Sequence, residues 1–365
     1  MDAVTVGIVG CGTISAAYLR AALDFPEYRI VACADLDLAR AQARAAKFDL
    51  RALSVEALLD DPSIEVVLNL TIPAAHAEIG LRAVEAGKHV YSEKPLGLAV
   101  PEARQLVERA LERGMRVGSA PDTFLGGAHQ TVRAALDADQ FGRIVSGTAC
   151  MMNHGHEHWH QDPGFYYQPG GGPLFDMGPY YLTALIDLLG PVASVCALTD
   201  RSAAERVVGS GPKAGTPIDI GTETHIAGLL RFATGAAISL ITSFDVWAHR
   251  HSPIELYGTK GSVLVPDPNR FDGQPMMAIA RAPWVDLPVT HGFAEADHRG
   301  VGLADMARAI RSQRAHRANG EMALHVVDIM QGLIEAGATG RTVDIATRCE
   351  RPSPLPRRRE IGLLD

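Results

Sequence analysis

The stretch HGHEHWH, residues 154–160, places four histidines at alternate positions with a glutamate and a tryptophan between them. Imidazole is a common metal ligand and also an ordinary hydrogen-bonding group, so this spacing suits two kinds of chemistry. If the preceding strand RIVSGTACMMN continues, the histidines share one face while Glu157 and Trp159 share the other, and Gly155 is the residue that would break this alternation. Trp159 and the aromatic residues of the nearby GFYYQPGGG supply flat apolar faces on which a sugar ring stacks.

Three interpretations of this stretch remain open. Histidines and Glu157 that hydrogen-bond sugar hydroxyls would form a substrate-binding wall, which is the interpretation that we favour. Two or three histidines with Glu157 would suit zinc or another divalent ion, but four histidines spaced two apart on an extended strand cannot all converge on one ion. The third interpretation is that the histidines serve the fold or an interface. We predict no metal and take as substrate-binding candidates His156, Trp159 and His160.

The stretch GIVGCGTIS near the start of the chain is typical of the turn that joins the first strand and helix of a Rossmann domain. In that turn the first glycine makes the tight bend, and the second lets the backbone approach the pyrophosphate, which rests on the helix N-terminus. Ser15 replaces the third glycine and is small enough for helix and strand to pack closely. The turn therefore predicts a dinucleotide site at Gly10, Gly12, Thr13 and Ile14.

Asp35 ends the next strand, RIVACAD, about 20 residues after the glycine turn, as in the Rossmann fingerprint. A carboxylate there accepts both ribose hydroxyls of NAD and repels the 2′-phosphate of NADP. Leu36 follows it, where an arginine would favour NADP. The alternative for Asp35 is an N-cap of the helix predicted to begin near Leu38. We therefore predict NAD as the cofactor.

These residues must be positioned by an alternation of short apolar strands and helical patterns that runs to about residue 122. Such alternation is typical of right-handed βαβ units on a parallel sheet. Beyond it the pattern changes to longer β-rich runs joined by short glycine-containing turns, which favour an antiparallel or mixed sheet. Helices are predicted at about 14–23, 38–48, 74–86, 100–113, 128–136, 301–312 and 321–338, and one begins near Asp176.

The composition limits the partners and the compartment. The chain has 365 residues, of which 47% are hydrophobic and 21% charged, and its net charge is −8. That charge gives no reason to expect nucleic acid or an anionic membrane as a partner, since both attract basic surfaces. Five scattered cysteines without a CxxC pair indicate reduced thiols, and neither a signal peptide nor an apolar run of about 20 residues is apparent. We expect a cytoplasmic protein that binds a small molecule, with the basic tail RPSPLPRRR loosely held.

The motifs GCGTIS, TIPAAH, EKP and GGGPLFDMGPYY, in this order, resemble those of the glucose-fructose oxidoreductase/inositol dehydrogenase (Gfo/Idh/MocA) family, and the resemblance covers nearly the whole chain. It implies an α/β plus α+β fold with a Rossmann domain at 1–123 and a tail at 351–365. Between them, residues 124–350 would form a substrate-binding and oligomerisation domain built on an open, predominantly antiparallel sheet. The resemblance also implies a homodimer or homotetramer.

The same resemblance implies that the lysine of EKP, Lys94, is the acid/base group. Oxidation of a secondary alcohol requires the hydroxyl proton to leave as the hydride departs. A lysine beside the cofactor can take that proton, particularly if burial and cofactor charge lower its pKa. Pro95 restricts the backbone before it to a defined bend that is compatible with a cis peptide. Without the family context, a solvated charge at a strand end would be the preferred interpretation of Lys94.

Asp176 is implied as the residue that orients Lys94 or contacts a substrate hydroxyl. Four residues later the family usually has a histidine as proton-transfer partner, and this chain has Tyr180. A phenol with a pKa of about 10 is a poorer base than imidazole near neutrality, so Tyr180 is expected to act as a substrate or relay hydroxyl. Its neighbour Tyr181 is expected to be packed.

Further cofactor-side candidates come from the TIP loop, which in the family runs beneath the cofactor, and from EKP; they are Asn69, Thr71, Pro73, Glu93 and Lys94. His76 either joins them or caps the helix that begins there. The segment SAPDT lies at the end of the last Rossmann strand. Because ligands lie at the carboxyl ends of parallel strands, Asp122 and Thr123 are predicted to face the nicotinamide or the substrate.

The function predicted from these features is an NAD-dependent dehydrogenase or reductase that interconverts a secondary alcohol and a ketone on a sugar, glycoside or cyclic polyol. One alternative is an NAD-assisted lyase or glycosidase that acts through a transient keto-sugar and regenerates its cofactor. The other alternative is a non-catalytic sensor that keeps the dinucleotide fold. Loss of the EKP lysine would mark such a sensor, and this chain keeps Lys94.

Overall fold

A sheet of six parallel strands forms the first part of the computed structural model, which describes residues 2–357 and 364–365. The strand order is β3-β2-β1-β4-β5-β6. The bounds are β1 (Val4–Val9), β2 (Tyr28–Ala34), β3 (Arg51–Leu53), β4 (Val66–Asn69), β5 (His89–Ser92) and β6 (Val117–Ser119). The order reverses between β1 and β4, so the carboxyl ends of these two strands border the crevice in which doubly wound proteins bind ligands.

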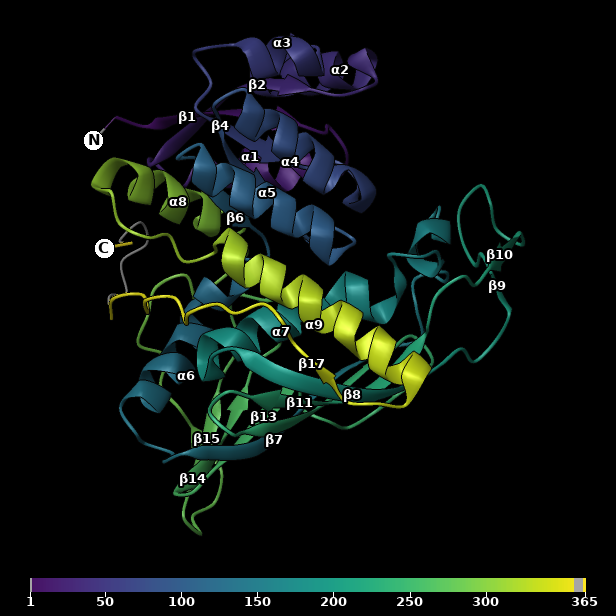
Figure 1. Cartoon of the computed structure of the whole chain (residues 1–365), viewed down its shortest axis with the longest axis vertical. Helices are drawn as coiled ribbons and strands as arrows, with labels where there is room; N and C mark the ends of the chain where they lie inside the picture. The colour runs from purple at the N-terminus through teal and green to yellow at the C-terminus, as the bar shows by residue number, and fades with distance from the viewer. Residues whose placement is uncertain (1, 358–363) are drawn as a thin grey trace.

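Helices on both sides of this sheet cover its buried, apolar strands, as a parallel sheet requires (Figure 1). They are α1 (Ser15–Ala21), α2 (Leu38–Phe48), α3 (Val55–Asp60), α4 (His76–Glu85) and α5 (Val100–Glu112). The four predicted helices are confirmed to within a few residues. The sequence analysis missed β3 and α3, which are too short to show a periodic pattern.

The second sheet is larger, and nine of its strands fall within the described residues, in the order β16-β15-β14-β13-β7-β12-β11-β8-β17. Only β7 and β12 pair in parallel there, which confirms an open, predominantly antiparallel sheet. The bounds are β7 (Ile144–Met152), β8 (Val192–Asp200), β11 (His225–Phe232), β12 (Ala237–Ser243), β13 (Ile254–Gly258), β14 (Gly261–Val265), β15 (Met276–Ile279), β16 (Val285–Asp286) and β17 (Val343–Asp344).

One face of the second sheet packs on helices, and the other face is open. Along β11 the buried Ile226 and Leu230 alternate with more exposed positions, of which Leu229 is 50% exposed. Leu198 on the neighbouring β8 is 75% exposed. A separate arm, formed by β9 (Glu205–Val207) and β10 (Pro217–Asp219), projects from the second sheet (Figure 1).

The remaining α-helices are α6 (Gly127–Asp137), α7 (Gly172–Leu189), α8 (Val301–Ser312) and α9 (Gly320–Thr339). Figure 1 shows α9 lying between the two parts, where it contacts α5 and β6 on one side and α7 and β8 on the other. Helix α8 packs on β2 and β6 of the first sheet, although it follows the second sheet in the chain. A domain boundary at residue 123 stays a prediction. Such a boundary would assign α8 to the second domain, although α8 packs on β2 and β6 of the first. None of the helices in the described part of the chain combines enough length and apolarity to cross a membrane.

The expectation of a loosely held tail is wrong for the part that the structure describes. Arg351 donates hydrogen bonds to the Asp187 carbonyl at 2.9 Å and to Asp137 at 2.9 Å. Leu355 is buried, and its backbone N–H donates to Gln130 at 2.8 Å. Backbone and apolar contacts therefore anchor the segment despite its basic composition, while residues 358 and 359 of RPSPLPRRR lie outside the described residues.

Candidate active site

Lys94 lies just after β5, at the carboxyl edge of the parallel sheet, and the Lys94–Pro95 peptide is cis. Its side chain is 15% exposed and reaches α7 from the other part of the molecule. The amine donates to Asp176 Oδ1 at 3.0 Å and also to the Asp176 carbonyl oxygen. The structure thus brings together the two residues that the motifs EKP and GGGPLFDMGPYY nominated.

Lys94 and Asp176 each stabilise the charged form of the other. Burial by itself lowers the pKa of Lys94, but Asp176, Tyr180 and Glu93 outweigh it, so the pKa lies above its usual value. Burial likewise raises the pKa of Asp176, yet Lys94 and His156 bring it down to about 2. The resting site therefore holds an ammonium and a carboxylate, and burial does not make Lys94 a free amine.

Tyr180 lies beneath the amine, with Lys94 Nζ 5.2 Å from the centre of its ring, a distance that suits a cation–π contact. Burial raises the pKa of Tyr180, so its hydroxyl is un-ionised near neutral pH. Tyr181 is buried, and its hydroxyl donates to the Cys150 carbonyl at 3.3 Å, in agreement with a packing role. Helix α7 begins at Gly172, four residues before the predicted start, because Pro173 suits the first turn of a helix.

The strand does not continue through HGHEHWH, and the alternation of its side chains is broken at Gly155. Strand β7 ends at Met152, and Gly155 has φ +78°, in the left-handed region, where a Cβ would lie 2.1 Å from the Tyr167 hydroxyl. The chain then turns, with the backbone N–H of His160 donating to the His156 carbonyl at 2.9 Å. A glycine in this conformation ends the strand alternation, so the histidines do not share a face.

Each of the four histidines accordingly has different surroundings. His154 stacks on Trp247 with ring centres 3.4 Å apart, and His158 is exposed. His160 lies edge-on to the rings of Phe165 and Tyr166. His156 alone reaches the lysine–aspartate pair, with Nε2 2.9 Å from Asp176 Oδ2.

Glu157 does not face a ligand. Its carboxylate binds the Arg206 guanidinium at 2.5 Å and accepts a hydrogen bond from the Tyr167 hydroxyl. Arg206 also pairs with Asp245 at 2.5 Å, and both Arg206 and Glu157 are buried. This buried ion cluster anchors the histidine loop. Sequence reasoning missed Arg206 because it lies about 50 residues away, on the β9–β10 arm.

A cavity of about 320 Å³ opens beside the lysine–aspartate pair. Its wall comes from the TIP loop on one side and from the segment 165–176 on the other, including Phe165 and Tyr166. Phe165 and the nearby Trp159 are more than half exposed, and His160 lies edge-on to Tyr166. Trp159 and His160 therefore stand beside the cavity as a predominantly aromatic rim.

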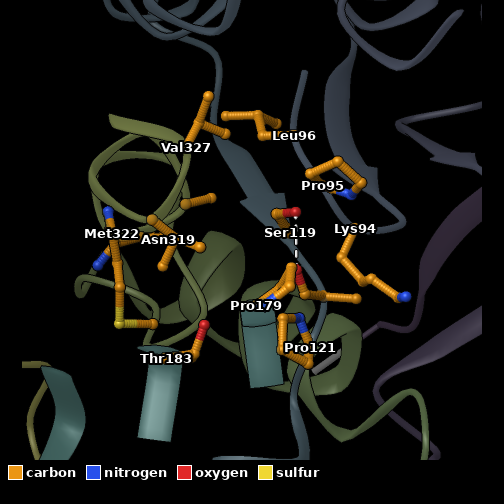
Figure 2. Close-up of a pocket in the computed structure, with 13 residues that line it drawn as sticks. Lys94, Pro95, Leu96, Ser119, Pro121, Pro179, Thr183, Asn319, Met322 and Val327 are labelled. Atoms are coloured by element: carbon orange, nitrogen blue, oxygen red, sulfur yellow. Dashed lines mark hydrogen bonds between the residues drawn. The ribbon is translucent and has the colours of Figure 1, made fainter. Parts of the chain in front are cut away.

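A second cavity of about 10 Å³ lies behind Lys94, where the ends of β5 and β6 meet α7 and α9. Figure 2 shows Pro179 and Thr183 of α7 facing Asn319 and Met322, at the start of α9, across this cavity. The Lys94 side chain extends away from that group. This gap has room for about one water molecule, so the substrate-sized space is the larger cavity.

The glycine turn fits a dinucleotide. Gly10 has φ +102°, and a Cβ there would lie 2.4 Å from the Leu70 carbonyl oxygen, so only glycine is tolerated. Nothing lies within 4 Å of a Cβ built on Gly12, which is exposed together with Thr13 while Ile14 is half-buried. The turn is therefore open on the side from which a pyrophosphate would approach.

Asp35 stands at the end of β2 beside this turn. Its carboxylate accepts from the Cys11 backbone N–H at 2.7 Å and from the Asp37 backbone N–H at 2.9 Å. The N-cap of α2 is Asp37, which accepts from Ala39, so the N-cap alternative for Asp35 is wrong. Arg44, which sequence reasoning missed, donates to the Gly12 carbonyl at 3.1 Å and braces the turn from α2.

The TIP loop is held by a buried network. Asn69 donates to the His76 carbonyl at 2.9 Å and accepts from the Thr71 hydroxyl at 2.7 Å. The His76 ring lies between the Pro95 carbonyl at 2.6 Å and the Thr71 carbonyl at 3.1 Å. Asn69 and His76 are fully buried and so support the loop from behind, while Thr71 is half-buried and Pro73 lines the large cavity. His76 caps no helix by its side chain.

Asp122 and Thr123 do not face the cleft, since each is only 1% exposed. Asp122 Oδ2 accepts from the backbone N–H groups of Gly300 at 2.8 Å and Gly302 at 2.9 Å, at the start of α8. Burial raises the pKa of Asp122 to about 6. The strand-end rule failed here because the carboxylate anchors a helix that the sequence places nearly 180 residues away.

Two further charged residues interact with the central groups of the site: Glu93 with Lys94, and Arg299 with Tyr180. Glu93 is half-buried and accepts from the Tyr18 hydroxyl at 2.9 Å. Burial lowers the pKa of Arg299, but Tyr180 and other neighbours raise it above its usual value. No motif pointed to Arg299, because it lies in the irregular segment before α8. Within residues 2–357 and 364–365, no group of three or more His, Cys, Asp or Glu is arranged to hold a metal ion.

Comparison with known proteins agrees with this geometry. The chain is 24% identical to a 1,5-anhydro-D-fructose reductase of Ensifer adhaerens over 93% of this chain and 98% of the relative. It is 26% identical to a D-xylose 1-dehydrogenase (NADP(+)) of Haloferax volcanii, over 93% and 99% of the two chains. The structure of a levoglucosan dehydrogenase with NADH and L-sorbose has a TM-score of 0.83 at 22% identity and covers 95% of this chain and 100% of that one, which shows a common fold.

Two family descriptions match most of the chain. Residues 4–120 match the oxidoreductase family with an NAD-binding Rossmann fold, and residues 129–264 match the GFO/IDH/MocA C-terminal domain. The first match contains the glycine turn and Lys94, and the second contains Asp176 and the histidine loop. The chain therefore belongs to the Gfo/Idh/MocA family and is an NAD-binding oxidoreductase.

Proposed function

We propose that this protein is an NAD-dependent dehydrogenase or reductase that interconverts a secondary alcohol and a ketone on a sugar, glycoside or cyclic polyol. The observation that carries the proposal is the Lys94–Asp176 pair, 3.0 Å apart, at the edge of a cavity of about 320 Å³ beside the dinucleotide turn. Relatives named as reductases or dehydrogenases of anhydrofructose and xylose support the substrate class.

The cofactor supplies the hydride acceptor or donor, and the protein supplies the proton. Lys94 carries an ammonium at rest, so Nζ is ready to donate a proton to the oxygen of a ketone. In the oxidation direction the amine must first lose its proton before it can accept one from the alcohol. Asp176 holds Nζ in place, and the Tyr180 hydroxyl, un-ionised near neutral pH, serves as a second hydrogen-bonding group for the reacting oxygen or for a neighbouring hydroxyl.

Substrate binding is proposed for the aromatic rim. Trp159 and Phe165 expose flat faces beside the cavity, and His160 adds a hydrogen-bonding group between them. Such a rim suits the C–H face and the hydroxyl edge of a sugar ring. Cofactor contacts are proposed for residues of the glycine turn, the end of β2, the TIP loop and EKP, which are Gly10, Gly12, Thr13, Ile14, Asp35, Thr71, Pro73 and Glu93.

We also propose that the protein is cytoplasmic and assembles as a homodimer or homotetramer through the open face of its second sheet. The five cysteines are free, which suits a reducing compartment. Exposed apolar side chains such as Leu198 and Leu229 on that face support the assembly.

The test of the chemistry is Lys94→Met, which keeps the length of the side chain and removes the amine. Formation of NADH is followed over a panel of inositols, aldoses and glucosides. We expect the wild type to release NADH in proportion to the sugar oxidised, and the variant to bind NAD normally and lose at least about 100-fold in kcat. Unchanged hydride transfer in the variant would sink the proposed mechanism. Turnover without net NADH in the wild type would instead favour a lyase or glycosidase that regenerates its cofactor.

A further inference from the structure

The carboxylate of Asp176 is shared between two partners on opposite sides. Oδ1 accepts from Lys94 at 3.0 Å, and Oδ2 lies 2.9 Å from His156 Nε2. An ionised carboxylate only accepts hydrogen bonds, so His156 Nε2 must carry the proton in this contact. The imidazole therefore donates to the same carboxylate that holds the ammonium of Lys94.

The His156 ring is held in this place by the protein, without need of a ligand. Its edges meet the rings of Tyr166 at 4.1 Å and Phe244 at 4.8 Å between centres. Its backbone N–H donates to the Tyr167 hydroxyl at 3.2 Å. Arg206 donates to the carbonyl of His154 at 3.1 Å, which ties the loop to the buried ion cluster. A ring that packing and backbone bonds fix so closely is preorganised to aim another side chain.

We propose that His156 is a positioning residue for Lys94. The imidazole holds Asp176 through Oδ2, so that Oδ1 is aimed at Nζ, and its hydrogen bond reduces the carboxylate charge that acts on the amine. This inference rests on the proposed function of Lys94. It replaces the direct contact with substrate that the sequence suggested for His156. His156 then acts on the reaction of Lys94 through Asp176, without a contact of its own to the amine or to the reacting hydroxyl.

The sign of the effect follows from the groups that face the pair. Asp176, Tyr180 and Glu93 favour the charged form of Lys94, while burial opposes it. Tyr166 from the 3-10 turn 164–167 and the buried His76 at the start of α4 are further titratable groups that interact with Lys94, and Arg299, before α8, interacts with Tyr180. A hydrogen bond from His156 to Oδ2 partly neutralises the charge of the carboxylate, so the carboxylate stabilises the ammonium of Lys94 less strongly. Removal of that bond should therefore make the amine harder to deprotonate.

The first experiment measures Lys94 directly, without cofactor or substrate. The chain has five lysines, so acetylation at a fixed alkaline pH can be followed at each by peptide mass spectrometry. His156→Phe keeps the ring and removes Nε2, His156→Gln keeps a donor, and His158→Phe makes the same change at an exposed position of the same loop. We expect Lys94 to react about three- to tenfold more slowly in His156→Phe only, where tenfold corresponds to one pKa unit.

The second experiment measures sugar oxidation by the same variants. His156→Phe should lower kcat about 10- to 100-fold through misalignment of Lys94, with KM changed less than about threefold, and should move the acid limb of the rate profile to higher pH. His156→Gln should recover most of kcat, and His158→Phe should match the wild type.

Two outcomes would overturn the inference. One is an unchanged or faster reaction of Lys94 in His156→Phe, which would mean that the imidazole does not act on the pair or merely covers it. The other is a raised KM with the wild-type kcat and pH profile, which would make His156 a substrate contact. The acetylation result stands even if the proposed oxidation fails, because it uses the protein alone.

Discussion

At the scale of single residues, the site depends on a charge arrangement that residue types alone do not define. Lys94 keeps its proton because Asp176 lies 3.0 Å away, although burial works in the other direction. Burial lowers the pKa of Lys94, and the charge of the Asp176 carboxylate outweighs that effect. Under the proposed function, the protonated Lys94 is ready to donate to the oxygen of a ketone, and oxidation should become faster as the pH rises.

Asp176→Asn tests this balance. The amide no longer stabilises the ammonium while burial still opposes it, so the pKa of Lys94 should fall by about 1–3 units and the acid limb of sugar oxidation should move to lower pH by the same amount. The value of kcat at its plateau should drop, since the amide holds Nζ less firmly. The measurement is kcat/KM against pH in the oxidation direction.

The direction of this shift is opposite to that expected for His156→Phe, so the two variants check each other. Asp162→Asn, at an exposed aspartate that pairs with Lys213 on the surface, is the control and should leave the profile in place. A shift of the Asp176→Asn profile to higher pH would contradict the electrostatic account.

At the scale of elements, two long-range anchors decide where the site residues lie. The Arg206–Glu157–Asp245 cluster holds the histidine loop against the β9–β10 arm. Asp122 holds the start of α8 against the end of β6. Glu157 and Asp122 were both predicted to bind a ligand, and both carboxylates are buried against the protein instead. The sequence around a carboxylate does not show whether its partner is a substrate, a distant guanidinium or a distant backbone N–H.

Asp122→Ala separates the anchoring role from substrate binding. The variant leaves two buried N–H groups at the start of α8 without their acceptor, and we expect the free energy of unfolding at neutral pH to fall by about 2–3 kcal/mol. Chemical denaturation measures this loss. Because Asp122 does not reach the cavity, KM for sugar should stay within about twofold of the wild type. A normal stability with a raised KM would restore the original assignment of Asp122 to the substrate.

The pH dependence that Asp122 contributes has a definite sign. Its pKa of about 6 in the folded protein is above the ordinary value near 3.8, so the folded state binds the proton more tightly. The contribution of this group to stability is therefore larger below its ordinary pKa and decreases as the pH rises through about 6.

At the scale of the whole molecule, α9 lies between two sheets of different kinds, and the active site forms where their edges meet (Figure 1). The cavity walls come from both parts, so neither part holds the site alone. No segment among the described residues covers the open face of the second sheet, and its exposed leucines are the basis of the proposed assembly.

The double variant Leu198→Lys/Leu229→Lys tests that assembly. Both side chains are at least half exposed, so the monomer should fold as before, while buried charges at an interface should shift the protein to a smaller species. Light scattering after size-exclusion chromatography measures the mass of wild type and variant. A monomeric wild type would show that the proposed assembly is wrong.

The resemblance of its motifs to the family pointed to the pair of Lys94 and Asp176, which lie 82 residues apart in the chain. The sequence by itself determined the parallel sheet with its dinucleotide turn and most helix bounds. These features are local: Gly10 needs a backbone that only glycine adopts, and amphipathic periodicity appears within one segment. Tertiary structure alone decided the partner of His156, the burial of Asp122 and the ion pair of Glu157, whose partners lie 20 to nearly 180 residues away. Whether a polar side chain meets a ligand or the protein depends on which distant segment packs against it, and no local pattern encodes that contact.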